Sequence, residues 1–223
     1  MKRALFALAL LALGAGSFNL SATAAAKLSD KPIGKEIAFV TGIQHDLNTR
    51  FSTPADAEKA GYFRFTNEDD TGAISYANLH WTSADPQHPS QLWYDVKGNL
   101  LGADFSVPLT KTPPHLWGVN PARWSKFGRP HVHYILTAPA GNGQYGHAVS
   151  GRAFVKAGGS LADPQAATIV KLGKAKSAST VAKVFTFPAE WDLIVWVKAN
   201  PSGAFADKNP LVHPTKNAGM GSM

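Results

Sequence analysis

Apolar residues recur at helical spacing near the start of the regular part of the chain. Four of them lie three or four positions apart: Ile37, Val40, Ile43 and Leu47. This spacing places them on one face of a helix, which we expect to be buried. Gly42 lies within the pattern and weakens it, so a short strand over residues 37–41 is the alternative.

A second, shorter helix is predicted to begin at Pro54. Thr53 is a suitable N-cap, Pro54 occupies the first helical position and Asp56 lies in the first turn. Gly61 is predicted to end this helix.

After Gly61 the pattern changes to the two-residue alternation that is typical of strands. The predicted strands are residues 62–66, 73–83, 91–96, 100–107, 129–137, 144–155, 183–187 and 191–197. Hairpin turns are predicted at residues 97–99 and 140–143, and a short helix capped by Asp163 at residues 166–172. The chain is therefore predicted to be an α+β protein, a mostly antiparallel β-sheet with a few short helices in a single domain.

The N-terminus has the three parts of a cleavable Sec-type signal peptide. Lys2 and Arg3 precede an apolar run over residues 4–13, and small residues at 22–26 offer a cleavage site after Ala24 or Ala26. The run is too short for a bilayer span. We therefore expect a signal peptide at 1–26, a globular domain at 27–212, a flexible tail at 213–223, and a mature protein in the periplasm or secreted, without stable membrane insertion.

Composition and charge narrow the class of protein further. The chain has no Cys, so it has neither disulfides nor a lipid-bearing Cys, and its six Trp and twelve Phe argue against disorder. The formal net charge is +7, but the basic residues are dispersed, and only Lys171, Lys174 and Lys176 cluster. A nucleic-acid partner is not expected, because there is neither a basic stripe nor a recognised module. At most, weak contact with anionic envelope polymers is expected.

Histidine offers the best candidate chemistry, because no Gly-x-Ser-x-Gly, His-Glu-x-x-His or phosphate-binding glycine motif is present. His131 and His133 are two positions apart, so on a strand both point to the same face, roughly 6–7 Å apart. Such a pair can bind one Zn, Cu or Fe ion. We expect His80 to be a third ligand on a neighbouring strand, and Glu190 or Asp192 to add a carboxylate.

His147 is a further candidate ligand whose position depends on the predicted second hairpin. A three-residue loop at 141–143 would place it with the His131–His133 pair, and a two-residue loop would place it on the other face. The alternative to a metal site is a pair of half-buried histidines that make ordinary hydrogen bonds.

Aromatic residues are the second candidate feature. Trp117 and Trp124 lie in a long Pro- and Gly-rich segment, and long loops in compact domains are often functional. With Trp81 and Tyr134 they could contact a sugar or an aromatic ligand. The alternative is that they fill the core of the sheet.

Several ordered motifs resemble a family of secreted, largely uncharacterised bacterial and fungal proteins. The motifs are residues 54–62, His80-Trp81, 85–95, 101–108, 113–118, 191–196 and 200–210, so the resemblance spans most of residues 53–212. It implies the fold and export, and it implies a histidine in the motif that contains His80 and another within residues 190–196. This chain has Glu190 and Ile194 there, and it has His131 and His133 elsewhere.

The sequence thus favours an exported protein that binds a transition metal through His80, His131 and His133, with Glu190 or His147 as a fourth ligand. With an open coordination position the metal would be catalytic, and with a closed one it would be structural. The alternatives are a metal-free binding module for a small molecule or glycan, and a structural envelope protein. The sequence leaves the substrate and the oligomeric state open.

Overall fold

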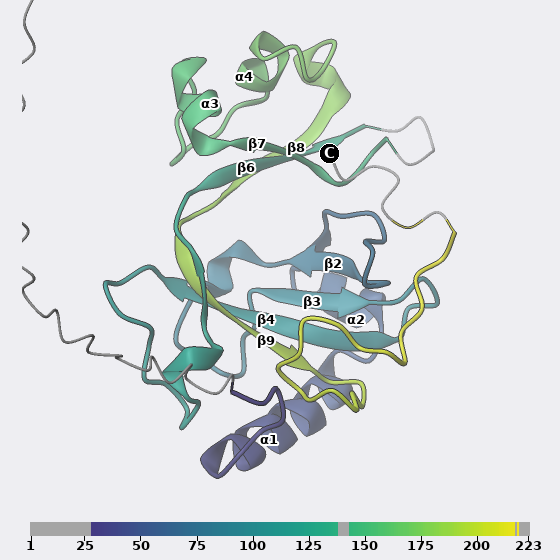
Figure 1. Ribbon diagram of the computed structural model, residues 1–223. Helices are drawn as coiled ribbons and strands as arrows, with labels where there is room; N and C mark the ends of the chain where they lie inside the picture. Colours follow the sequence, from purple (N-terminus) through teal and green to yellow (C-terminus); the bar gives the residue numbers. More distant parts are fainter. Residues whose placement is uncertain (1–27, 138–142, 217, 219–223) are drawn as a thin grey trace, which may run out of the picture.

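The computed structural model describes residues 28–137, 143–216 and 218, and it has four layers (Figure 1). Helix α1 (Lys35–Arg50) lies beneath a six-stranded antiparallel sheet, a three-stranded antiparallel sheet lies above it, and α3 (Gly151–Lys156) and α4 (Ala166–Lys171) cover the top. The predicted α+β class, a mostly antiparallel sheet with a few short helices in one domain, is confirmed. The predicted signal peptide lies outside the described residues.

The larger sheet has the strand order β1-β2-β3-β4-β9-β5. Its strands are β1 (Phe63–Arg64), β2 (Ile74–Ala77), β3 (Gln91–Tyr94), β4 (Leu100–Pro108), β9 (Glu190–Trp196) and β5 (Ser125–Phe127). The smaller sheet has the order β7-β6-β8, formed by β7 (His147–Ser150), β6 (His131–Leu136) and β8 (Val181–Phe187). The predicted hairpin at residues 97–99 joins β3 to β4 as expected.

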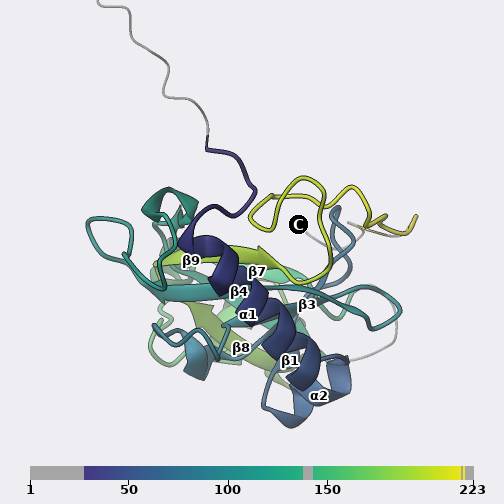
Figure 2. The same cartoon turned by 90° about the horizontal axis from the view of Figure 1, so that it is seen from below.

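Helix α1 confirms the helical alternative for residues 37–47, and the strand alternative is wrong. Val40, Ile43 and Leu47 are buried against the six-stranded sheet, which the helix crosses from below (Figure 2). The second predicted helix, α2 (Pro54–Lys59), is also confirmed, with a capping box between Thr53 and Asp56.

Three predictions of secondary structure are wrong in detail. Residues 79–81 form a short 3₁₀ helix, η1 (Leu79–Trp81), rather than part of a strand, because Asn78 accepts a hydrogen bond from the His80 amide. The strand predicted over 144–155 ends at Ser150, whose side chain caps α3. The N-cap of α4 is Gln165, so Asp163 does not cap that helix. Two further 3₁₀ turns are η2 (Pro121–Arg123) and η3 (Ala178–Thr180).

A two-stranded ribbon passes from one sheet to the other and turns a corner on the way (Figure 1). In the larger sheet Phe127 of β5 pairs with Glu190 of β9, and in the smaller sheet His131 of β6 pairs with Phe187 of β8. Only residues 128–130 and 188–189 separate the two pairs. The bend therefore brings the start of β6 close to the start of β9, on the inner side of the corner.

The two faces of the larger sheet differ in chemistry. Along β4, Ala103, Phe105 and Val107 pack on the helix side in the main core, together with Leu193 and Val195 of β9. The alternate positions face the smaller sheet. Four of them are polar or acidic: Asp104, Ser106, Glu190 and Asp192.

Aromatic residues fill part of the space between the two sheets. Phe65, Phe185 and Phe187 form a buried cluster with Ile135 and Ala77. Residues 200–212 pack over the larger sheet, and Val212 belongs to the buried cluster that contains Trp93 and Trp196. Among the described residues, no helix combines the length and apolar character needed to cross a membrane.

Candidate functional site

A pocket of about 320 Å³ lies between the two sheets, on the inner side of the corner. Three carboxyl groups come from the larger sheet, two imidazoles come from β6, and aromatic rings form part of the wall. The lining residues are Phe65, Thr66, Ser75, Gln91, Asp104, Phe127, His131, His133, Phe187, Glu190, Asp192 and Ile194.

The three carboxyl groups lie on neighbouring positions of two paired strands. Glu190 and Asp192 alternate along β9, and Asp192 pairs with Ser106 of β4, two residues after Asp104. Their exposed fractions are 4% for Glu190 and 6% for each aspartate. Three buried carboxyl groups this close together cannot all be ionised at low cost.

Hydrogen bonds hold the two aspartates in place. The indole Nε1 of Trp93 donates to Asp104 Oδ2 at 2.9 Å, and Ser106 Oγ donates to Asp192 Oδ1 at 2.9 Å. The hydroxyls of Ser106 and Ser90 lie 2.8 Å apart, which fixes the serine rotamer. Gly102 allows the Trp93 ring to lie against β4, since a Cβ there would be 2.7 Å from Trp93 Cε3.

Burial raises the pKa of both aspartates, and the Asp104 and Asp192 carboxyls hydrogen-bond to each other. The negative charge of Asp192 raises the pKa of Asp104 further, whereas the indole of Trp93 opposes the rise. Hydrogen bonds from Ser106 and Asp104 favour the ionised form of Asp192. The pair is therefore arranged to share one proton, which Asp104 carries more readily.

Glu190 lies beside this pair and is the least satisfied of the three carboxyl groups. Burial, together with the charge of Asp192, raises its pKa to about 8, against a small opposing effect of Ser106. Its Oε2 atom is buried and has no hydrogen-bond partner among the described residues. At neutral pH Glu190 therefore presents a protonated carboxyl group with an unused oxygen.

His131 and His133 form the opposite wall, as the sequence predicted for a pair on one strand face. Their ring centroids are 4.9 Å apart, and each ring stacks on a phenylalanine, Phe187 for His131 and Phe185 for His133. Burial lowers the pKa of both, and that of His133 falls to about 3 with a contribution from His131. Both imidazoles are thus neutral, and the buried Nδ1 of His133 lacks a partner in the described structure.

His80 and His147 lie outside this pocket, contrary to the ligand set that the sequence suggested. His80 is exposed on η1 and not on a strand. His147 pairs with Tyr134, so it belongs to the opposite face of β6 from His133, where its ring stacks on Tyr134 with centroids 4.9 Å apart. Of the six candidate ligands that the sequence offered, His131, His133, Glu190 and Asp192 line this pocket, and His80 and His147 do not.

The predicted aromatic contacts lie mainly within the core. Trp124 is buried, and Trp117 stacks on Phe39 with centroids 5.4 Å apart, in the core beneath the sheet. Trp81 packs on Tyr62, and Tyr134 is buried beneath α3 and α4. These four side chains therefore pack between elements, in line with the alternative expectation that they fill the core.

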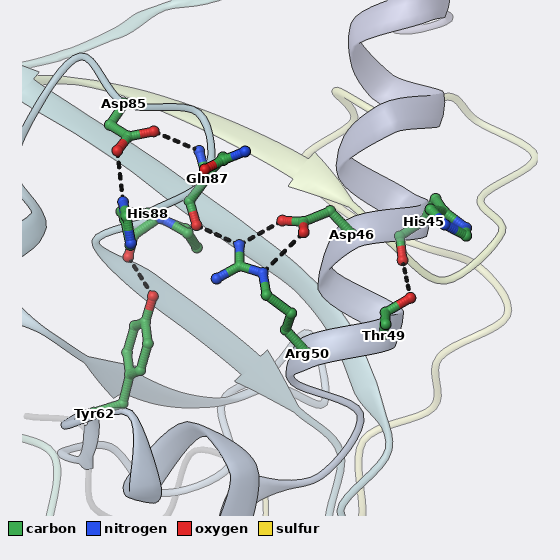
Figure 3. Close-up of polar contacts among 9 residues, drawn as sticks. His45, Asp46, Thr49, Arg50, Tyr62, Asp85, Gln87 and His88 are labelled. Atoms are coloured by element: carbon green, nitrogen blue, oxygen red, sulfur yellow. Dashed lines mark hydrogen bonds and ion pairs between the residues drawn. The ribbon is translucent and has the colours of Figure 1, made fainter.

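A second polar cluster fastens the loop before β3 to α1 (Figure 3). His88 Nδ1 lies 2.6 Å from Asp85 Oδ2, and Tyr62 donates a hydrogen bond to the carbonyl of Pro89. Arg50 binds Asp46 of its own helix and reaches the carbonyl of Gln87 in the loop. Every charged group drawn in this cluster has a partner, so we assign it a structural role.

Sequence reasoning missed Asp104, Ser106 and Trp93. A signal was present, because Asp104 is the one charged residue in the mainly apolar strand segment Leu100–Val107. A charged residue within such a strand is buried only where something compensates its charge. The partner of Asp104, Asp192, lies on a distant strand whose register the sequence does not reveal.

No three His, Asp or Glu side chains of the described residues are arranged to hold a metal ion together. The donor types nevertheless suit a transition metal, since two neutral imidazoles face buried carboxyl groups. No protein-family model, curated protein or solved structure matched this chain in the three comparisons.

Proposed function

We propose that this protein binds a small molecule in the pocket between the sheets and catalyses its hydrolysis by acid–base chemistry. The observation that carries the proposal is the buried carboxyl of Glu190, whose Oε2 atom has no partner among the described residues, beside the Asp104–Asp192 pair. Carboxyl groups whose environments separate their protonation states are the usual means of acid–base catalysis near neutral pH.

Glu190 takes the role of general acid. With a pKa of about 8 it holds its proton at pH 7, and Glu190 is one of the residues that line the pocket. It can donate this proton to the leaving oxygen of a substrate as the bond to that oxygen breaks.

Asp192 takes the role of general base, with Asp104 as its positioning partner. Asp192 accepts the proton of a water molecule whose oxygen bonds to the substrate, and Asp104 holds the proton of the ground-state pair. Two carboxyl groups on one strand, two residues apart, are roughly 6–7 Å apart at the backbone. A protonated and an ionised carboxyl group on one strand face are the pair of groups that glycoside hydrolysis uses.

The walls favour an uncharged, partly apolar substrate. Phe65, Phe127 and Phe187 provide flat apolar surface, and Gln91 and Ser75 provide hydrogen-bonding groups. Neutral His131 and His133 add donors and acceptors without charge. A small glycoside, or an ester of similar size and polarity, matches these apolar and uncharged polar walls.

The test is a screen of small aryl glycosides and esters for hydrolysis by the wild-type protein, Glu190→Gln and Asp192→Asn. We expect a wild-type rate with a bell-shaped pH dependence that declines above about pH 8, where Glu190 loses its proton. Each variant should lose at least about 100-fold in rate. Glu58→Gln, on the exposed side of α2, is the matched control and should leave the rate unchanged.

A ligand-binding screen tests whether the pocket is the site. A thermal-shift screen with a fragment library should find compounds that stabilise the wild type and Glu58→Gln but not Glu190→Gln. Compounds that stabilise all three proteins equally, together with no hydrolysis across the panel, would rule out the pocket as the site.

A second candidate function is transition-metal binding, favoured by the convergence of His131, His133 and Glu190 on one pocket. The free Nδ1 of His133 and Oε2 of Glu190 are the expected donors. The metal would be Zn, Cu or Fe, and binding would require side-chain rotation from the arrangement described above.

Metal binding is tested by mass spectrometry of untagged protein and by titration with Zn or Cu. We expect His131→Ala/His133→Ala to lose the metal and His80→Ala/His147→Ala to keep it. Less than a tenth of an equivalent in the wild type, with no melting shift on adding metal, would contradict this candidate.

We also propose that the protein acts outside the cytoplasm, because residues 1–26 have the pattern of a cleavable signal peptide. Fractionation of the producing cells and intact mass measurement provide the test. A mature N-terminus at Ala25 or Lys27 is expected, and an unprocessed cytoplasmic chain would contradict export.

A further inference from the structure

Residues 143–180, which include the top layer of the molecule, have a concentrated excess of positive charge. They include five basic residues and one acidic residue, Asp163. The five are Arg152, Lys156, Lys171, Lys174 and Lys176, and all are exposed. We call these five the basic cap.

The fold joins two groups of basic residues that are separate in the sequence. Arg152 and Lys156 belong to α3, whereas the three lysines lie at and after the end of α4, and both helices cover the outer face of the smaller sheet (Figure 1). A Cβ at Gly158, just after α3, would be 3.6 Å from Lys171 Nζ. The ammonium of Lys171 thus lies close to the chain just after the end of α3.

The charge of the basic cap is not neutralised within the described structure. None of the five residues enters an ion pair there, whereas Lys208 and Arg123 elsewhere each have an acidic partner. Asp163 is engaged by the side chain of Gln165. A concentrated, unpaired set of like charges attracts a surface or polymer of opposite charge.

We propose that the basic cap binds the protein to an anionic phospholipid surface. Val155 lies between Arg152 and Lys156 in α3 and is 51% exposed, so an apolar side chain accompanies the charges. Lysine side chains suit headgroups, because each is a point charge on a long apolar stem. Each basic residue near an anionic membrane contributes independently to binding, so five together hold a folded protein at the surface.

The composition of the basic cap favours lipid over single-stranded nucleic acid. Stacking on bases requires exposed aromatic rings. Within the described residues 143–180, Phe154 is buried and the ring of Tyr145 is covered by Arg64. The pocket lies on the far side of the smaller sheet from α3 and α4, so surface binding leaves it free.

The experiment measures cosedimentation with vesicles of phosphatidylcholine, with and without phosphatidylglycerol. We expect binding only to the anionic vesicles, with loss of binding at 0.5 M salt. Lys171→Gln/Lys174→Gln/Lys176→Gln should weaken partitioning on the order of 100-fold. Lys35→Gln/Lys97→Gln/Lys111→Gln removes the same charge elsewhere and should bind within a few fold of the wild type. Intact mass measurement ensures that all preparations share one N-terminus.

Two outcomes would overturn the proposal. One is equal weakening by both triple variants, because it assigns binding to net charge rather than to the basic cap. The other is tight binding to heparin or DNA with none to anionic vesicles, which assigns the cap to a polymer. Val155→Ser sharpens the result, since it should weaken vesicle binding but leave heparin binding unchanged.

Discussion

Two buried glutamates in this protein have opposite surroundings. Glu36, at the start of α1, accepts hydrogen bonds from the amides of Ile33 and Asn120 and from two nitrogens of Arg123. Burial alone would raise its pKa, but the hydrogen bonds from Arg123, Asn120 and Ile33 bring the pKa below its ordinary value. Glu190 is buried as deeply, has no cation nearby in the described structure, and its pKa rises to about 8.

The difference separates a carboxyl that stabilises the fold from one that the fold tolerates. At Glu36 every lone pair is used, and Arg123 also contacts the chain at Lys31 and the ring of Phe205. At Glu190 one oxygen is unused, and the residue lines a pocket. Natural proteins keep such costly groups mainly where function requires them.

The largest expected effect is at the satisfied site. Arg123→Met leaves Glu36 buried and unpaired, and we expect a loss of about 3–5 kcal/mol in the free energy of unfolding. Urea unfolding at pH 7 measures it, with Arg152→Met on the exposed side of α3 as the control. A loss below 1 kcal/mol would show that the pair contributes little and that the contrast with Glu190 is weaker than described.

At Glu190, the unsatisfied site, substitution is expected to raise the free energy of unfolding rather than lower it. The folded-state pKa of Glu190 is raised. The contribution of its protonated form to the free energy of unfolding is therefore present below about pH 4.5 and is lost as the pH rises through about 8. Glu190→Gln does not titrate, so it should be more stable than the wild type by about 3 kcal/mol at pH 7. The advantage should vanish near pH 4. Unfolding curves at both pH values provide the measurement, and a destabilised variant at pH 7 would make Glu190 structural.

A smaller loss is expected when the pocket loses a donor. Trp93→Phe removes the indole N–H that binds Asp104, and an unpaired buried acceptor costs about 1–3 kcal/mol. The pKa of Asp104 should rise further, because that hydrogen bond favours the ionised form. Urea unfolding at pH 7 measures the loss. A loss well below 1 kcal/mol would show that this hydrogen bond contributes little to stability.

The smallest effect concerns a buried polar group with no role. Thr186 Oγ1 has no hydrogen-bond partner among the described residues, and it lies outside the pocket. Thr186→Val keeps the shape and should change stability by less than about 1 kcal/mol. Any hydrolytic or binding activity should be unaffected, in contrast to Glu190→Gln. A large loss of stability would mean that the hydroxyl is satisfied in solution.

Local sequence patterns predicted the elements that local interactions determine. Helices α1 and α2 follow from spacing and from the Thr53–Pro54–Asp56 cap, and the β3–β4 hairpin follows from its turn at residues 97–99. The predicted strand over residues 73–83 was wrong at residues 79–81, because the Asn78 side chain accepts a hydrogen bond from a backbone amide there. Alternation alone does not indicate such a bond.

The site was predicted in part for the same reason. The pair His131 and His133 needed only the two-residue period of a strand, and Glu190 was proposed as their partner. His80 and His147 failed because their positions depend on a 3₁₀ turn and on a hairpin register. Asp104 was missed because its importance arises from Asp192, which the pairing of β4 with β9 brings alongside.

The placement of β9 between β4 and β5 also bears on how the protein folds. This interior strand is synthesised after both of its neighbours in the sheet, and Gly102 pairs with Trp196 across a long stretch of the chain. Contacts between such distant segments form slowly, because the chain must close a long loop before they contribute. The larger sheet and the carboxyl cluster therefore assemble late, only after residues 190–196 are available. A chain that ends before β9 should stay unfolded, and in a growing chain the carboxyl cluster remains incomplete until residues 190–196 have been synthesised.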